Sequence, residues 1–214
     1  MLAGISQRRY LQLLLSGVVI MLVWSAVNPH DYFTWFLEVF PVLAGIVILT
    51  ITYSRFTFTR FAYLLLALHS TVLIVGGHYT YAEMPLFNWL RDAYDLARND
   101  YDRFAHITQG FFPAIIVREI LIRLSPLKQG PWLFFVVVCI CLAISASYEL
   151  IEWWVAIASG SSAVAFLATQ GDVWDTQWDM FLALCGAIAS LLILGGYHDR
   201  ILENVAKRHG ATNR

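Results

Sequence analysis

The sequence predicts an all-α protein: a polytopic membrane helical bundle with six transmembrane helices and both the N and C termini cytoplasmic. Of the 214 residues, 59% are hydrophobic and 14% are charged, and the mean hydropathy is +0.64. A soluble domain of average composition carries about 25% charged residues, so an ordinary soluble fold is excluded. The net charge of −1 gives no reason to expect a nucleic-acid partner. We expect a single integral membrane domain over residues 1–214.

Six apolar runs supply the predicted spans, each near the ~20 residues needed to cross the hydrocarbon core. They cover residues 10–27, 34–53, 58–77, 103–124, 132–157 and 174–196. The first run follows Arg8 and Arg9, as the apolar core of a signal peptide would. No convincing small-residue cleavage site follows it, and the next apolar run begins almost at once. We therefore expect the first run to be a transmembrane helix.

The longest polar segment, residues 78–101, separates the third and fourth spans. The spacing of its apolar residues predicts a short interfacial helix over about residues 85–96. The fourth run is the least hydrophobic of the six, so we expect it to face other helices more than lipid. Near its inner end, Arg118 and Glu119 are expected to form a structural ion pair, with Arg123 helping. His69, in the third run, is expected to hydrogen-bond another helix.

Lysine and arginine residues are concentrated on one predicted side of the membrane. That side holds Arg8, Arg9, Arg55, Arg60, Arg123, Lys128, Arg200, Lys207, Arg208 and Arg214. The other side holds Arg91, Arg98 and Arg103. The positive-inside rule then predicts cytoplasmic termini. Most tryptophans map near the opposite interface, which agrees with this orientation.

A pair of carboxylates, Glu149 and Glu152, lies near the outer end of the fifth run. Their spacing puts both on one helical face. Glu149 lies roughly 25 Å along the axis from Trp132, close to the outer edge of the hydrocarbon. Acidic groups at membrane depth are costly and usually functional. This pair is therefore the starting point for a predicted site.

Other helices present histidine or carboxylate groups at the same predicted depth, again at i,i+3 or i,i+4 spacing. The candidate metal ligands are His78, Asp102, His106, Glu149, Glu152, Asp175 and Asp179. Glu83 and Asp172 are candidate general bases. Glu38 is interpreted instead as an interfacial acid that extends outward.

Clustered acids repel one another unless cations, protons or arginines compensate them. Imidazole together with carboxylates suits a divalent metal, with Zn, Mn, Fe, Mg and Ca all admitted. Arg103, Arg91 or bound protons could compensate the acids in place of a metal. The sequence leaves these alternatives open.

The same residues carry a resemblance to a known family. The segments are His78 to Glu83, Tyr101 to Arg103 with His106 and Gln109 to Phe111, Tyr148 to Trp154, and Thr169 to Asp179. Over nearly the whole chain they resemble the YjdF family of bacterial inner-membrane proteins. Ala105 and Ala168 stand where glycine is expected in relatives. The resemblance implies a multi-pass protein of the bacterial inner membrane and implies no activity.

Three functions are compatible with these features. A metal near lipid headgroups suits a hydrolase or transferase acting on a lipid-linked or phosphate-bearing substrate, or on a small molecule. The alternatives are a proton- or divalent-cation-coupled transporter and a structural or assembly factor in the membrane. Membrane lipid is the expected partner, and the sequence does not determine the oligomeric state.

Overall fold

The structure is a computed structural model that describes residues 5–160 and 164–212, and the regular secondary-structure elements of these residues are all helices, joined by turns and loops. The long helices are α1 (Gln7–Ser25), α2 (Tyr32–Thr52), α3 (Arg60–Tyr79), α5 (Tyr101–Leu124), α6 (Pro131–Ser159) and α8 (Asp175–Thr212). The shorter ones are η2 (Tyr81–Glu83), α4 (Pro85–Tyr94) and α7 (Val164–Leu167). The predicted all-α fold is therefore confirmed. Arg214, one of the residues predicted on the cytoplasmic side, lies outside the described residues.

Side chains at helix starts explain several of the boundaries. The side chains of Ser6, Asp31 and Thr59 accept hydrogen bonds from backbone N–H groups in the first turns of α1, α2 and α3. Pro131 occupies the first turn of α6, where its missing N–H costs nothing. Two further prolines lie inside α2 and α5, as membrane helices tolerate. Each of the six predicted spans begins within three residues of the start of an observed helix.

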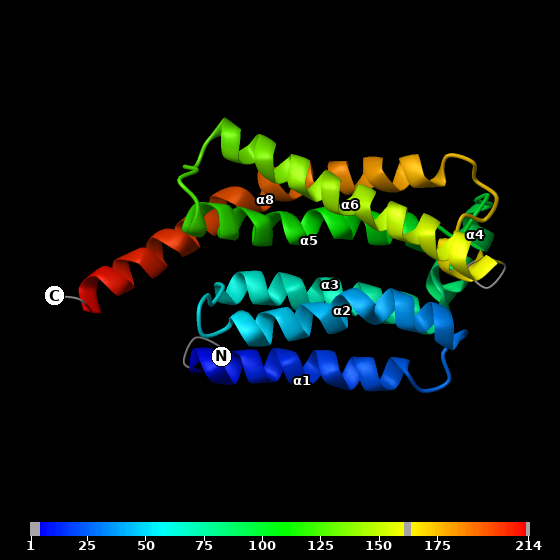
Figure 1. Cartoon of the computed structure of the whole chain (residues 1–214), viewed down its shortest axis with the longest axis horizontal. Helices are drawn as coiled ribbons and strands as arrows, with labels where there is room; N and C mark the ends of the chain where they lie inside the picture. The colour runs from blue at the N-terminus through cyan, green and yellow to red at the C-terminus, as the bar shows by residue number, and fades with distance from the viewer. Residues whose placement is uncertain (1–4, 161–163, 213–214) are drawn as a thin grey trace.

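The largest difference from the predicted elements concerns α8. The predicted sixth span ends at residue 196, but the helix continues to Thr212. Glycine lowers helix propensity without forcing a break, and the residues after Gly196 include many good helix formers. The helix is about 57 Å long at ~1.5 Å per residue. Its C-terminal part extends past the rest of the bundle (Figure 1).

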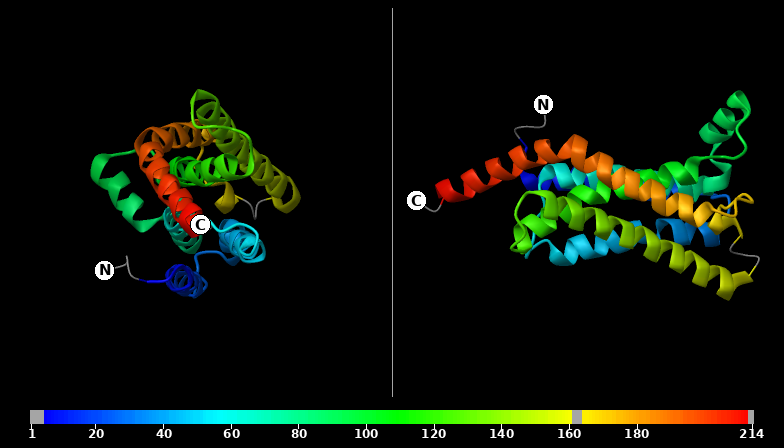
Figure 2. Two further views of the ribbon diagram at one scale, coloured as in Figure 1. Left: turned by 90° about the vertical axis from the view of Figure 1, so that its left-hand side faces the viewer. Right: turned by 90° about the horizontal axis from the view of Figure 1, so that it is seen from above.

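The bundle has two parts joined by the packing of α3 against α5. In Figure 1, α1, α2 and α3 lie together in one part and α5, α6 and α8 in the other. One apolar cluster lies within α1–α3, and another, around Ala114, Leu133 and Val137, lies among α5, α6 and α8. We call the end that carries α4 and the starts of α5 and α8 the outer end. The end that carries the α5–α6 loop is the inner end (Figure 2).

Glycine lets α5 and α8 approach very closely. A Cβ atom at Gly110 would overlap the backbone of Ala183, and one at Gly186 would overlap the backbone of Ile107. Small residues at helix contacts are the usual means of close packing between membrane helices. This contact holds the first turns of α5 and α8, which carry acidic residues, side by side.

Four helices in the described part of the chain are long and apolar enough to cross a membrane: α2, α3, α6 and α8. Many large apolar side chains on their outer faces are exposed, including Phe40, Ile48 and Leu192. Such a surface is unfavourable in water and suitable in lipid. The fold is therefore that of a membrane-embedded helical bundle.

Candidate metal centre

Acidic groups from α5, α6 and α8 meet at the outer end. The side chains that converge there are Asp102 and His106 of α5, Glu149 and Glu152 of α6, and Asp179 of α8. All are buried except Glu152, which is partly exposed. Their ligand atoms form two overlapping groups, each with all atoms within 4.8 Å of one another: Asp102, His106 and Asp179, and His106, Glu149 and Glu152. Five of the seven predicted ligands therefore come together.

His106 belongs to both groups. Its Nδ1 lies 2.9 Å from Gln109 Oε1, and because that oxygen can only accept, Nδ1 carries the proton. The other nitrogen, Nε2, lies 3.6 Å from Asp102 Oδ1 and 3.7 Å from Glu149 Oε1. A histidine whose tautomer is fixed in this way presents a bare nitrogen to a metal. This nitrogen lies within 3.7 Å of a carboxylate oxygen from each group, so the two groups surround one candidate cation position.

Two of the converging carboxylates have buried oxygens without partners. Glu149 Oε1 and Asp179 Oδ1 have no hydrogen-bond partner among the described residues, and the two residues are 7% and 2% exposed. An unsatisfied buried polar group costs about 1–3 kcal/mol, and more when it is charged. These oxygens therefore require something besides protein side chains, such as a cation, a proton or water.

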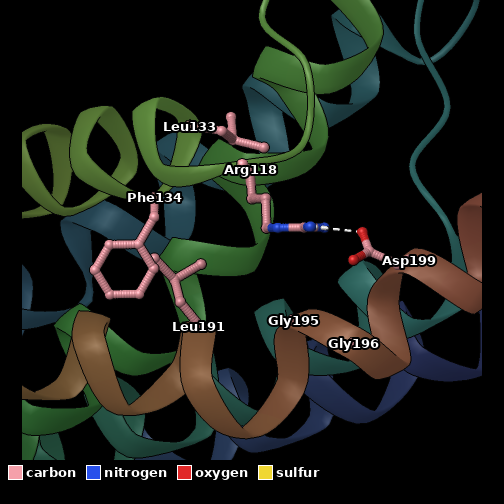
Figure 3. A pocket seen from close by; sticks show the side chains of 8 residues that line it. Arg118, Leu133, Phe134, Leu191, Gly195, Gly196 and Asp199 are labelled. Carbon is pink, nitrogen blue, oxygen red and sulfur yellow. Dashed lines mark hydrogen bonds and ion pairs between the residues drawn. The ribbon is translucent and has the colours of Figure 1, made fainter.

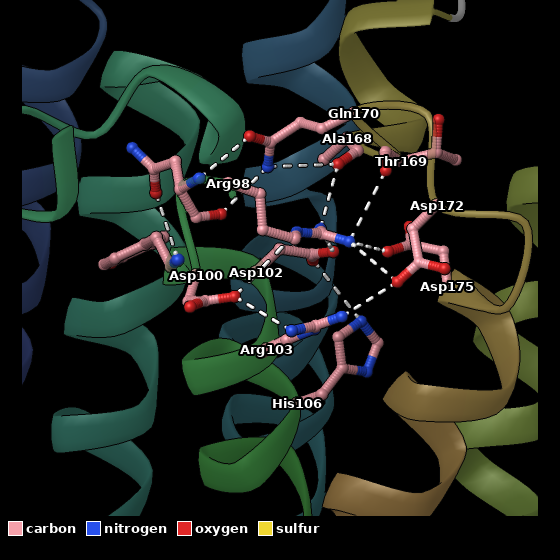
Figure 4. Close-up of polar contacts among 12 residues, drawn as sticks. Arg98, Asp100, Asp102, Arg103, His106, Ala168, Thr169, Gln170, Asp172 and Asp175 are labelled. Carbon is pink, nitrogen blue, oxygen red and sulfur yellow. Dashed lines mark hydrogen bonds and ion pairs between the residues drawn. The ribbon is translucent and has the colours of Figure 1, made fainter. Parts of the chain in front are cut away.

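Arg98 is the main protein cation of the cluster, a role that its position in the sequence did not predict. It is 7% exposed, forms an ion pair with Asp175 and lies 3.5 Å from Asp102 (Figure 4). It also donates to the carbonyls of Ala168 and Thr169, at 3.2 and 3.4 Å. Burial lowers the pKa of its guanidinium, but the hydrogen bond and charge of Asp175, together with the charges of Asp102 and Asp179, keep the pKa above its ordinary value. Nothing in the local sequence marks this loop arginine as buried.

The two arginines expected to compensate the acids behave differently. Arg103 pairs with Asp100 at 3.1 Å and Asp172 at 2.8 Å, at the rim of the cluster. Arg91 pairs with its neighbour Asp92 on the exposed surface of α4. Compensation therefore comes from Arg98 and Arg103, and Asp175 is held by arginine rather than grouped with the other ligand atoms.

The structure also corrects the interpretation of Glu38. It is predicted to lie at the interface and to point outward, but it is buried, with 2% of its surface exposed. The α2 backbone approaches α3 closely, since a Cβ at Gly77 would lie 3.2 Å from Glu38 Cβ. The carboxyl accepts a hydrogen bond from Tyr81, and its Oε2 is otherwise unpartnered. An acid one turn into an apolar helix, at the depth of the other acids, was the signal that could have identified it.

The structure does not bring His78, Glu83 or Asp172 into these groups. Nδ1 of His78 donates to the Ser25 carbonyl at 3.0 Å, and its ring packs 4.4 Å from that of Trp24, so it ties α3 to α1. Glu83 is exposed and accepts from Asn88. The Trp174 backbone N–H, and then Arg103, hold the pKa of Asp172 below its ordinary value, which opposes a role as general base.

A second buried polar network lies at the inner end, and it differs from the expected ion pair. Glu119 accepts from Arg123 at 2.7 Å and from His198 Nε2 at 3.1 Å, while Arg118 pairs with Asp199 at 2.5 Å. Arg118 also donates to His198 Nδ1 at 3.0 Å. His198 therefore lies between Arg118 and Glu119, and the direct pair predicted between adjacent residues does not form. Adjacent residues on a helix point in different directions.

Comparisons with known proteins identify the family. The predicted membrane protein family DUF2238 matches residues 10–200. Inner membrane protein YjdF of Escherichia coli (strain K12) is 44% identical over 186 residues, which cover 87% of this chain and 89% of that protein. No solved structure shows a significant match. The resemblance to the YjdF family and the bacterial inner-membrane location are therefore confirmed.

Proposed function

The chain belongs to the DUF2238 family of predicted membrane proteins, and we propose that it binds a divalent cation at the outer end of its bundle for hydrolysis or transfer at a phosphate-bearing lipid headgroup. The observation that carries this proposal is the pair of buried, unpartnered oxygens, Glu149 Oε1 and Asp179 Oδ1, on two residues whose ligand atoms group with that of His106. We also propose six membrane spans, with α1 and α5 added to the four helices that are long and apolar enough to cross a membrane, and both termini cytoplasmic. The lysine and arginine distribution supports this orientation.

The residues fit a hard or borderline divalent cation. Asp102, His106, Glu149, Glu152 and Asp179 would hold it, with one imidazole and several carboxylate oxygens as donors. Because His78 lies elsewhere, a single imidazole takes part, which favours Mn, Fe or Mg over a histidine-rich zinc centre. Asp175 stays with Arg98 and adjusts the charge of the cluster.

When bound, such a cation supplies Lewis acidity and lowers the pKa of a water ligand to near neutrality. The chain's own residues bind and orient the substrate. Arg98 and Arg103 line a groove of ≈ 440 Å³ next to the cluster. Arginine forks match phosphate oxygens, and a phosphate here would compete with Asp100 and Asp172 for Arg103.

We assign the proton-accepting role to Glu38 in place of Glu83 and Asp172. Glu38 is buried beside the cluster and keeps one unpartnered oxygen, whereas Glu83 is exposed and Asp172 is neutralised by Arg103. Tyr81, hydrogen-bonded to Glu38, orients its carboxyl. This assignment predicts that Glu38→Gln keeps the metal and loses turnover.

The test compares melting temperatures with and without EDTA for the wild type, Glu149→Gln and the control Glu203→Gln, which alters an exposed acid on α8. A ligand present at 100 times its Kd stabilises by about 2.7 kcal/mol. For a chain of this size that is roughly 5–11 °C. EDTA should lower the melting temperature of the wild type and the control by this amount and leave Glu149→Gln unchanged.

The opposite pattern of melting temperatures would refute the proposal. A cluster held by shared protons and Arg98 would leave the wild type insensitive to EDTA, with metal below stoichiometric amounts by mass spectrometry. In that case Glu149→Gln would relieve repulsion and hold or raise the melting temperature. This outcome would favour a structural role for the acids.

Transport of protons or divalent cations is a second candidate, favoured by the polar groups placed along α5. His69 is 3.5 Å from Thr108 between the outer cluster and the inner network of Glu119 and His198. Cation-dependent fluorescence in proteoliposomes tests it. Uptake by the wild type that is lost in His69→Leu would favour transport over hydrolysis.

A further inference from the structure

A pocket unrelated to the metal cluster lies at the inner end, among α5, α6 and α8 (Figure 3). Its volume is ≈ 170 Å³. Leu133, Phe134 and Leu191 supply an apolar lining, and Arg118 and Asp199 supply a cation and an anion. The pocket therefore combines an apolar surface with two opposite charges.

The two charges are held in place by surrounding groups. Arg118 is 7% exposed and donates to His198 as well as to Asp199. Asp199 is more accessible, with 29% of its side chain exposed, and it also accepts from Gln129 at 2.6 Å. The guanidinium is thus anchored in the bundle, and the carboxylate lies at its edge.

The pocket borders the lipid-facing surface. Phe134 is 37% exposed, and Leu192 and Ile193, next to the lining residue Leu191 on α8, are 73% and 67% exposed. In an inner-membrane protein such apolar residues contact acyl chains. The pocket also lies beside the first turns of α6, where the exposed Trp132 marks interfacial depth. A lipid can therefore reach it sideways from the membrane.

We propose that this pocket binds the headgroup of a zwitterionic phospholipid. The phosphate binds Arg118, the ammonium group binds Asp199, and the acyl chains lie along Phe134 and Leu192. An anionic headgroup would satisfy Arg118 but face the Asp199 carboxylate, so charge complementarity favours a lipid that carries both signs. On binding, the Arg118–Asp199 ion pair is replaced by two others, one between Arg118 and the phosphate and one between Asp199 and the ammonium group.

Glycine makes the space for this ligand. A Cβ atom at Gly195 would meet nothing within 4 Å, although the residue is buried. The volume is smaller than the ≈ 300–1,000 Å³ typical of small-molecule sites, so the pocket takes a headgroup while the rest of the lipid stays in the bilayer. Because Gly195 lines the pocket and leaves open space around the position of a Cβ atom, Gly195→Leu should place its side chain in the pocket.

The experiment measures lipid binding to delipidated protein in detergent by native mass spectrometry, with phosphatidylethanolamine and phosphatidylglycerol as probes. The wild type should bind phosphatidylethanolamine at least tenfold more tightly than phosphatidylglycerol. Gly195→Leu should lose this binding at least tenfold. The control Gly17→Leu, on an exposed face of α1 with equal space around the Cβ, should bind as the wild type does.

Asp199→Asn provides an independent test, which decides the matter if Gly195→Leu fails to fold. It removes the partner for ammonium and keeps Arg118, so the preference should reverse toward phosphatidylglycerol. Equal binding of the two lipids by the wild type would overturn the proposal. Unchanged phosphatidylethanolamine binding by Gly195→Leu, or an unchanged preference in Asp199→Asn, would overturn it as well.

Discussion

Replacing Arg98 with methionine tests how the outer acids are held together. The guanidinium joins Asp102 and Asp175 to the carbonyls of Ala168 and Thr169, and methionine keeps much of the length while removing the charge and every donor. Breaking a buried ion pair from one side costs about 3–5 kcal/mol, because the remaining charge is left uncompensated. For a protein of 150–250 residues this lowers the melting temperature by roughly 6–20 °C.

The assay is thermal unfolding in detergent followed by intrinsic tryptophan fluorescence, which the chain's eight tryptophans provide. The matched control is Arg91→Met, since Arg91 and Asp92 form an exposed pair with side chains 35% and 67% accessible. Exposed pairs contribute about 0–1 kcal/mol, so this control should melt close to the wild type. A loss for Arg98→Met no larger than that for Arg91→Met would refute the argument.

A double-mutant cycle sharpens the result. Arg98→Met combined with Asp175→Asn removes both members of the pair, so the buried charge left by the single mutant disappears. The double mutant should then be more stable than the sum of the two single losses predicts. Simple additivity would mean that Arg98 acts through its carbonyl contacts alone.

Two further predictions concern packing and topology. Gly110→Leu should destabilise the bundle by about 1–3 kcal/mol or more, because its side chain meets the Ala183 backbone. The control Gly45→Leu, which has open space around the Cβ, should cost little. Equal melting temperatures for the two variants would contradict the close α5–α8 contact. A reporter fused at Asn99 should be active in the periplasm and one fused after Arg214 in the cytoplasm, and reversed signals would end the proposed orientation.

The sequence by itself predicted the class of fold and much of the candidate site. Apolar runs of membrane length are a local property, so the all-α membrane bundle followed from them directly. Helical spacing likewise placed Asp102 with His106 and Glu149 with Glu152 on shared faces, because residues three or four apart are neighbours on any helix. The depth of each acid along its helix then predicted that these pairs would meet.

Tertiary structure decided which side chains point into that meeting place. His78 lies at the expected depth but faces α1, and Glu38 turns inward because α2 packs closely against Gly77. Arg98 lies in a loop, where no periodicity predicts orientation, and only the approach of the 168–175 segment buries it among carboxylates. Rotation of a helix about its axis, and the path of a loop, depend on contacts between residues far apart in sequence. These contacts separate the acids held by arginine from those left free for a cation.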